Sequence, residues 1–73
     1  MKHIGGEFHH IVRKNLVLYR KKRGLTQEKL ARKMNTNRTY ISWLESGKAN
    51  PTLTVLLQLA EHLEIEPSYL FVR

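Results

Sequence analysis

The chain has 73 residues, enough for one small domain and too few for a large substrate cleft or a separate sensing domain. It carries 13 Lys and Arg against 6 Asp and Glu, a formal net charge of +7. Cysteine is absent, which excludes disulfides, thiolate metal sites and cysteine nucleophiles. We find no apolar segment typical of a secretion signal or a membrane span, and therefore predict a cytoplasmic protein.

The charge is unevenly distributed along the chain. Residues 1–48 contain 12 basic and 3 acidic side chains, whereas residues 49–73 contain one basic and 3 acidic side chains. This asymmetry indicates that one part of the molecule meets an anionic partner. A basic surface that is merely solvated is the alternative. The run at residues 20–23 is too short and too isolated to favour a membrane surface.

Apolar spacing predicts an all-α fold. A first helix over about 7–22 presents Phe8, Val12 and Leu16 on one face, and Gly24 ends it. Shorter helices follow at about 27–34, 37–46 and 53–63, with Thr26, Asn37 and Thr52 as N-caps, and a last turn begins near Pro67. We predict one domain over 1–73, a compact bundle of about five short helices, with residues 1–6 as a flexible N-terminus.

The second and third helices are joined by a turn of only two or three residues. That length suits helices that cross at a large angle, as in a helix-turn-helix over about 27–46. Ala31 is small where the two helices must approach closely, and Asn35 tolerates the left-handed backbone of a sharp turn. Gly47 fits the position that ends the third helix.

The stretch LTQEKLARKMNTNRTYISWLESGK, residues 25–48, resembles the helix-turn-helix of Cro and lambda-repressor-like regulators. The segments from Asn50 to Leu53, Leu59 to Leu63 and Tyr69 to Phe71 are similar to the last two helices of that family. The resemblance covers about residues 11–71. Residues 37–42 also resemble the recognition helix of restriction–modification controller proteins. Asn35 stands where the family usually has Gly, and Trp43 where it usually has a polar or small residue.

The resemblance implies that helix 37–46 lies in the major groove of DNA. We expect Arg38 to read a guanine with its forked guanidinium. Asn37 caps the helix, contacts a base, or does both. Trp43 either packs on sugars and thymine methyls or fills a gap in the bundle. The predicted base-reading set is Asn37, Arg38, Thr39, Ser42 and Trp43.

Further residues are expected at the phosphates and in the scaffold. A helix N-terminus favours a phosphate, which places Gln27 at the DNA backbone, as the resemblance also implies. Lys48 follows the third helix and is a second phosphate ligand. The predicted phosphate-binding set is Gln27, Ser46, Lys48 and Asn50. The resemblance implies an ion pair between Arg20 and Glu45 that holds the third helix against the first.

The predicted function is sequence-specific regulation of transcription by a homodimer on a two-fold symmetric operator in double-stranded DNA. The expected dimer surface lies in the acidic part of the chain, at Leu53, Val55, Ile65, Tyr69 and Phe71. RNA polymerase is a possible further partner. An antitoxin that binds a toxin protein is the alternative function, and a bundle that only binds proteins is a third.

Enzymatic and metal-dependent functions are not indicated. The four histidines, His3, His9, His10 and His62, have no carboxylate pair, phosphate loop or nucleophile motif beside them. Adjacent His9 and His10 point about 100° apart on a helix, so they do not form a shared site alone. We predict no catalytic residue, no metal and no cofactor.

Overall fold

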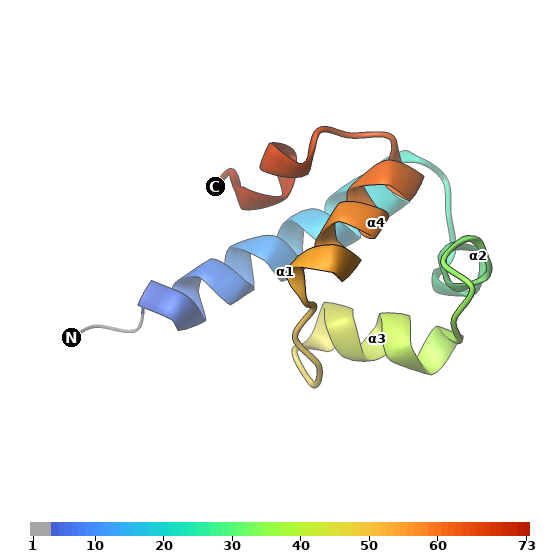
Figure 1. The fold of residues 1–73 in the computed structure, drawn as a ribbon, viewed down its shortest axis with the longest axis horizontal. Helices are drawn as coiled ribbons and strands as arrows, with labels where there is room; N and C mark the ends of the chain where they lie inside the picture. Colours follow the sequence, from blue (N-terminus) through green and yellow to red (C-terminus); the bar gives the residue numbers. More distant parts are fainter. Residues whose placement is uncertain (1–3) are drawn as a thin grey trace.

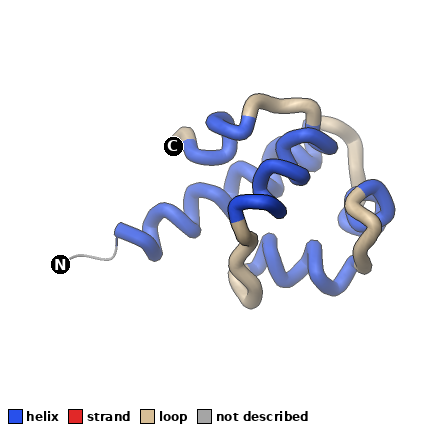
Figure 2. The backbone as a smooth tube through the Cα atoms, in the orientation of Figure 1, coloured by secondary structure: helices blue, strands red, loops and turns tan. Residues whose placement is uncertain are grey.

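The computed structural model describes residues 4–73 and, from Glu7 onward, their side chains. This part of the chain forms four α-helices and one 3-10 helix: α1 (Ile4–Lys22), α2 (Gln27–Lys33), α3 (Arg38–Ser46), α4 (Leu53–Leu63) and η1 (Pro67–Phe71). Helix α1 runs through the length of the molecule, with α3 below it and α4 in front in the view of Figure 1. Figure 2 shows helices and loops alone over these residues, which confirms the all-α prediction.

Helix α1 is longer than its apolar pattern predicts. It begins at Ile4, so residues 4–6 of the segment expected to be flexible are helical, while residues 1–3 lie outside the described part. No capping residue in the sequence fixes this start, and the pattern reports only where the helix faces other elements. The other end agrees with the prediction, since Gly24 has the left-handed φ of +69° just after Lys22.

The three predicted N-caps are confirmed by their hydrogen bonds. Thr26 Oγ1 accepts from the backbone N–H of Lys29 at 3.0 Å. Asn37 Oδ1 accepts from the third residue of α3 at 2.8 Å, and Thr52 Oγ1 from the third residue of α4 at 3.2 Å. Each cap satisfies one of the free backbone donors at a helix start, so the bounds of α2, α3 and α4 are set locally.

The core lies where α1 meets α2, α3 and α4. Its fully buried members are Leu16, Leu30, Ile41, Leu44, Leu59 and Leu63, and Leu70 of η1 is fully buried as well. Not every large apolar residue of these helices is buried, because Phe8 is 43% exposed, Leu57 47% and Leu53 68%. An apolar stripe marks the inner face of a helix, and these three lie on parts of α1 and α4 that other elements cover only partly.

The C-terminal segment is fastened along α1. Asn15 on α1 donates from Nδ2 to the carbonyl oxygens of Leu70, at 2.9 Å, and Val72, at 2.6 Å. The rings of Phe8 and Phe71 stack with centroids 5.0 Å apart. Residues 55 or more positions apart in sequence thereby lie side by side, and the chain end follows α1 (Figure 1).

Arg23 joins the end of α1 to the end of α4. Its Nε donates to the carbonyl of Leu63 at 2.6 Å, and its Nη2 to that of Glu64 at 2.8 Å. Glu64 takes the left-handed conformation that often ends a helix, with φ of 59°. A guanidinium here satisfies terminal carbonyls and suits the negative end of the helix dipole. The basic run at residues 20–23 therefore contains a structural arginine.

Candidate nucleic-acid interface

Helices α2 and α3 meet through a tight turn. Thr36 N–H donates to the carbonyl of Ala31 at 2.8 Å, and Asn35 has the left-handed φ of 57° that the sequence predicts. Ala31 is 2% exposed, as expected for a small residue at a close helix contact. Figure 1 shows α2 nearly end-on while α3 lies across the view, so the two helices cross at a large angle. The unit is a helix-turn-helix.

Helix α3 has a buried and an exposed face. Ile41 and Leu44 are completely buried and fix the rotation of the helix. The opposite face presents the predicted base-reading side chains, of which Arg38, Thr39 and Trp43 are exposed. This division follows from the helical period, since residues three and four apart share a face. Arg38, Thr39, Ser42 and Trp43 therefore lie along one helix edge. Ser42 is half-buried, and Asn37 is exposed just before the helix begins.

The sequence left two possible roles open for Asn37 and for Trp43. Asn37 caps α3 through Oδ1, and its residue is exposed, so its amide NH₂ remains available as a donor. Trp43 is 46% exposed. About half of this residue is open to solvent, so its indole does not fill the interior of the bundle.

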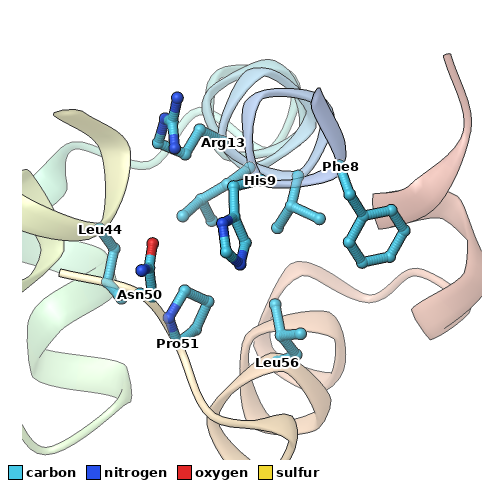
Figure 3. A pocket seen from close by; sticks show the side chains of 9 residues that line it. Phe8, His9, Arg13, Leu44, Asn50, Pro51 and Leu56 are labelled. Atoms are coloured by element: carbon cyan, nitrogen blue, oxygen red, sulfur yellow. The ribbon is translucent and has the colours of Figure 1, made fainter. Parts of the chain in front are cut away.

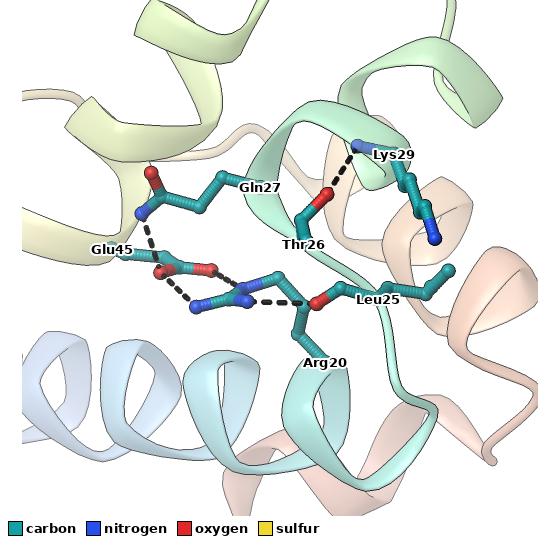
Figure 4. Close-up of polar contacts among 6 residues, drawn as sticks. All are labelled: Arg20, Leu25, Thr26, Gln27, Lys29 and Glu45. Atoms are coloured by element: carbon teal, nitrogen blue, oxygen red, sulfur yellow. Dashed lines mark hydrogen bonds and ion pairs between the residues drawn. The ribbon is translucent and has the colours of Figure 1, made fainter.

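A buried polar network fixes α3 against α1 and α2. Arg20 donates to Glu45 from Nε to Oε2 at 2.6 Å and from Nη2 to Oε1 at 3.1 Å (Figure 4). The two side chains are only 11% and 7% exposed. Arg20 Nη1 also donates to the carbonyl of Leu25 at 2.8 Å. The forked geometry holds Glu45 in one orientation and thereby sets the position of the last turn of α3.

Gln27 belongs to this network. Its Nε2 donates to Glu45 Oε1 at 2.9 Å, which links the first residue of α2 to α3 (Figure 4). This contact was absent from the sequence prediction, which placed Gln27 at a DNA phosphate. An amide nitrogen has two N–H donors, so one remains after the bond to Glu45. The half-buried side chain is thus held in place with one donor to spare.

The other predicted phosphate ligands lie at and beyond the end of α3. Gly47 ends the helix with φ of 89°, as predicted. Ser46, Lys48 and Asn50 are all exposed. Ser46 Oγ makes one long bond, at 3.4 Å, to the carbonyl of Trp43. The segment 47–52, which we call the connector, therefore presents polar and basic groups beside the exposed edge of α3.

Arg13 on α1 adjoins the connector and was not singled out from the sequence. An ideal Cβ built on Gly47 would lie 3.2 Å from both Cζ and Nε of Arg13. The guanidinium is therefore packed against the backbone of Gly47. An arginine seven residues before Arg20 is two helical turns away on the same face of α1, which is the signal that could have found it.

A cavity of about 170 Å³ separates α1 from the connector and α4. Most of its wall is apolar, and Arg13, His9 and Asn50 supply the polar atoms. In Figure 3 the side chains of Arg13 and His9 leave α1 on the side of the connector, where Asn50 and Pro51 lie. No group of three or more metal-ligating side chains occurs among the residues described, and His3 lies outside them.

The side chains predicted to form a dimer surface differ in exposure. Leu53 and Tyr69 are 68% and 48% exposed. Val55 and Ile65 are half-buried against the core, and Phe71 is half-buried on the ring of Phe8. Leu57, which was not in the predicted set, is 47% exposed one turn after Leu53. The sequence pattern alone did not separate the apolar residues that serve the core from those that remain accessible.

The model of the helix-turn-helix family matches residues 16–70, most of the chain. The protein belongs to the Cro and lambda-repressor-like helix-turn-helix family. Its members are DNA-binding regulators and not a class of enzymes. This helix-turn-helix protein is 40% identical over 55 residues to an uncharacterised HTH-type transcriptional regulator of Archaeoglobus fulgidus, covering 73% of this chain and 79% of the relative. A similar regulator of Sinorhizobium fredii is 36% identical over 55 residues, covering 75% and 71%.

Two crystal structures are similar to this helix-turn-helix protein over most of its length. The restriction-modification controller protein C.AhdI from Aeromonas hydrophila matches with a TM-score of 0.80 and 36% identity, over 86% of this chain and 96% of its own. The hypothetical transcription factor NHTF from Neisseria matches with a TM-score of 0.83 and 29% identity, over 89% and 75%. No helix in the described range 4–73 is long and apolar enough to cross a membrane.

Proposed function

We propose that this protein is a sequence-specific transcriptional regulator that binds a two-fold symmetric operator as a homodimer, with α3 in the major groove. The observation that carries the proposal is the exposed edge of α3, held in a fixed position by the Arg20–Glu45–Gln27 network. Regulation by a DNA-bound protein would take place in the cytoplasm of a bacterial or archaeal cell, the kinds of organism in which the relatives occur.

Arg38 is the central base-reading residue of this proposal. It is exposed on the first turn of α3, and none of the described acidic side chains pairs with it. A guanidinium there can bind guanine O6 and N7 together, a pairing that discriminates by about 1–3 kcal/mol against a wrong base. Asn37, Thr39, Ser42 and Trp43 contact neighbouring bases, with the Trp43 ring against a thymine methyl or a sugar.

The DNA backbone is held from both sides of α3. The spare amide donor of Gln27 binds a phosphate at the start of α2, where the backbone N–H groups also favour an anion. Ser46, Lys48 and Asn50 bind a second phosphate beyond the end of α3. Phosphate contacts fix the register of the protein on the duplex, while the base contacts select the sequence.

A homodimer supplies the second half-site, about 34–36 Å away on the same face of the duplex. The accessible apolar side chains Leu53, Leu57 and Tyr69 are the proposed centre of the dimer contact. Val55, Ile65 and Phe71 support that surface from the core side. The similarity to C.AhdI makes a restriction–modification controller the specific candidate. An operator next to a promoter would place the dimer beside RNA polymerase.

Selection of binding sites from random-sequence DNA, at two salt concentrations, tests the proposal. The wild type should enrich a two-fold symmetric site, and Arg38→Ala should lose that enrichment. Arg32→Ala is the matched control, because Arg32 is an exposed arginine on α2 that pairs with Glu28. Salt-sensitive binding without any enriched sequence would contradict the proposal and would direct the search to a protein partner such as a toxin.

A further inference from the structure

Arg13 has a guanidinium without an acceptor in the part of the chain that the structure describes. The side chain is half-buried, yet no hydrogen bond or ion pair involves it. By contrast, Arg20 makes three hydrogen bonds and Arg23 two. A guanidinium carries five N–H donors, so one held in place without an acceptor is suited to an anion from outside the chain.

The neighbours of Arg13 lack the carboxylates that could neutralise it. Glu7 pairs with Arg73, Glu28 with Arg32 and Glu45 with Arg20. The remaining acidic residues are Glu61, Glu64 and Glu66. They lie in the last turn of α4 or beyond it, and none of them forms an ion pair with Arg13. The connector instead adds Lys48, the residue after Gly47. This corner of the molecule is consequently cationic.

The position of Arg13 relative to the connector is fixed by Gly47. The absence of a side chain at this residue lets the guanidinium pack against the backbone. That contact brings the charge of α1 next to Ser46, Lys48 and Asn50, the proposed phosphate ligands at the end of α3. A charge held by packing loses less conformational entropy on binding than a free lysine does.

We propose that Arg13 binds a DNA phosphate and extends the backbone contact of the connector onto α1. The inference rests on the proposed DNA-binding function and adds a residue outside the helix-turn-helix to the interface. The phosphate is expected to adjoin the one bound by Lys48, since Arg13 packs on Gly47 and Lys48 is the next residue of the chain.

The salt dependence of operator binding measures this contact. Log K falls with log salt at a slope of about −0.9 for each phosphate contact, so two copies of Arg13 in a dimer account for a slope change of about 1.8. Arg13→Gln should make the slope shallower by that amount. Arg13→Lys keeps the charge and should therefore retain most of the wild-type slope. Lys21→Gln is the matched control. It removes one charge from the same helix, eight residues or about 12 Å away, which exceeds the screening length of about 8 Å at physiological salt.

Ethylation interference on the selected operator locates the contact. In the wild type, ethylation of one phosphate beside the Lys48 contact should weaken binding in each half-site. Ethylation of that phosphate should not affect binding by Arg13→Gln. The inference would be overturned if the salt dependence of operator binding had the same slope in Arg13→Gln as in the wild type and in Lys21→Gln. It would also be overturned if Arg13→Gln bound the operator more weakly but with an unchanged salt slope and an unchanged ethylation pattern. Failure of the wild type to enrich any operator would contradict the proposed function instead.

Discussion

Replacing Glu45 by glutamine should strongly destabilise the fold. The carboxylate accepts two hydrogen bonds from Arg20 and one from Gln27, and its side chain is only 7% exposed. Glutamine keeps the shape but turns one acceptor oxygen into an NH₂ donor that faces other donors. Removing one partner of a buried pair costs about 3–5 kcal/mol. We expect about 3 kcal/mol for Glu45→Gln, because one oxygen can still accept from Arg20.

That loss is large for a chain of 73 residues. At about 0.05–0.15 kcal/mol per residue, the whole domain has a free energy of unfolding of about 4–11 kcal/mol. A loss of about 3 kcal/mol corresponds to a fall in Tm of about 12–24 °C for a domain of this size. Urea unfolding followed by far-UV circular dichroism measures the difference directly.

The control is the exposed pair of Arg32 and Glu28, whose side chains are 75% and 63% exposed. Glu28→Gln should change stability by less than about 0.5 kcal/mol. The double variant Arg20→Met with Glu45→Leu should be more stable than the sum of the losses in the single variants Arg20→Met and Glu45→Leu predicts. In the double variant no unpaired charge remains buried. Our reasoning is refuted if Glu45→Gln costs no more than Glu28→Gln, or if the two effects at the buried pair simply add.

Two further predictions concern the contacts between α1 and the C-terminal segment. Asn15→Ala removes both hydrogen bonds to the backbone carbonyls of that segment and should lower the free energy of unfolding in urea by about 2 kcal/mol. Asn50→Ala, at an exposed position, is the control and should lower it by less than about 0.5 kcal/mol. Equal effects of the two variants would contradict a stabilising role for the Asn15 hydrogen bonds. The hydrogen bond and the charge of Arg73 lower the pKa of Glu7, so this pair stabilises the fold above the ordinary carboxyl pKa and loses its effect as pH falls through the lowered pKa. An NMR titration should show that lowered pKa in the wild type and its return to the ordinary value in Arg73→Gln, and an unchanged titration would contradict the pairing.

The features that the sequence predicted correctly are those set by neighbouring residues. The caps at Thr26, Asn37 and Thr52 act over three residues, and Asn35 and Gly47 need only their own backbone conformation. The separation of α3 into a buried and an exposed face follows from its period. These are local properties, and the pattern of side chains contains them.

The features that the sequence missed depend on which elements meet. Asn15 lies among apolar residues of α1, and its role became visible only when the C-terminal carbonyls were placed beside it. Arg23 looked like one member of a basic run until the end of α4 was found next to it. The hydrogen bond from Gln27 to Glu45 was missed because it joins residues 18 positions apart. A contact between distant segments leaves no periodic signal in the sequence.

Trp43 is the only tryptophan of the chain, and it lies 46% exposed on the edge of α3. Indole emission responds to the water around the ring, so any partner that covers this edge changes the intrinsic fluorescence of the unlabelled protein. Unfolding alters the surroundings of a ring that is already half in water much less than those of a buried one. The chain thus contains an optical reporter of occupancy at this edge, and we expect its emission to change less on unfolding than that of a fully buried ring.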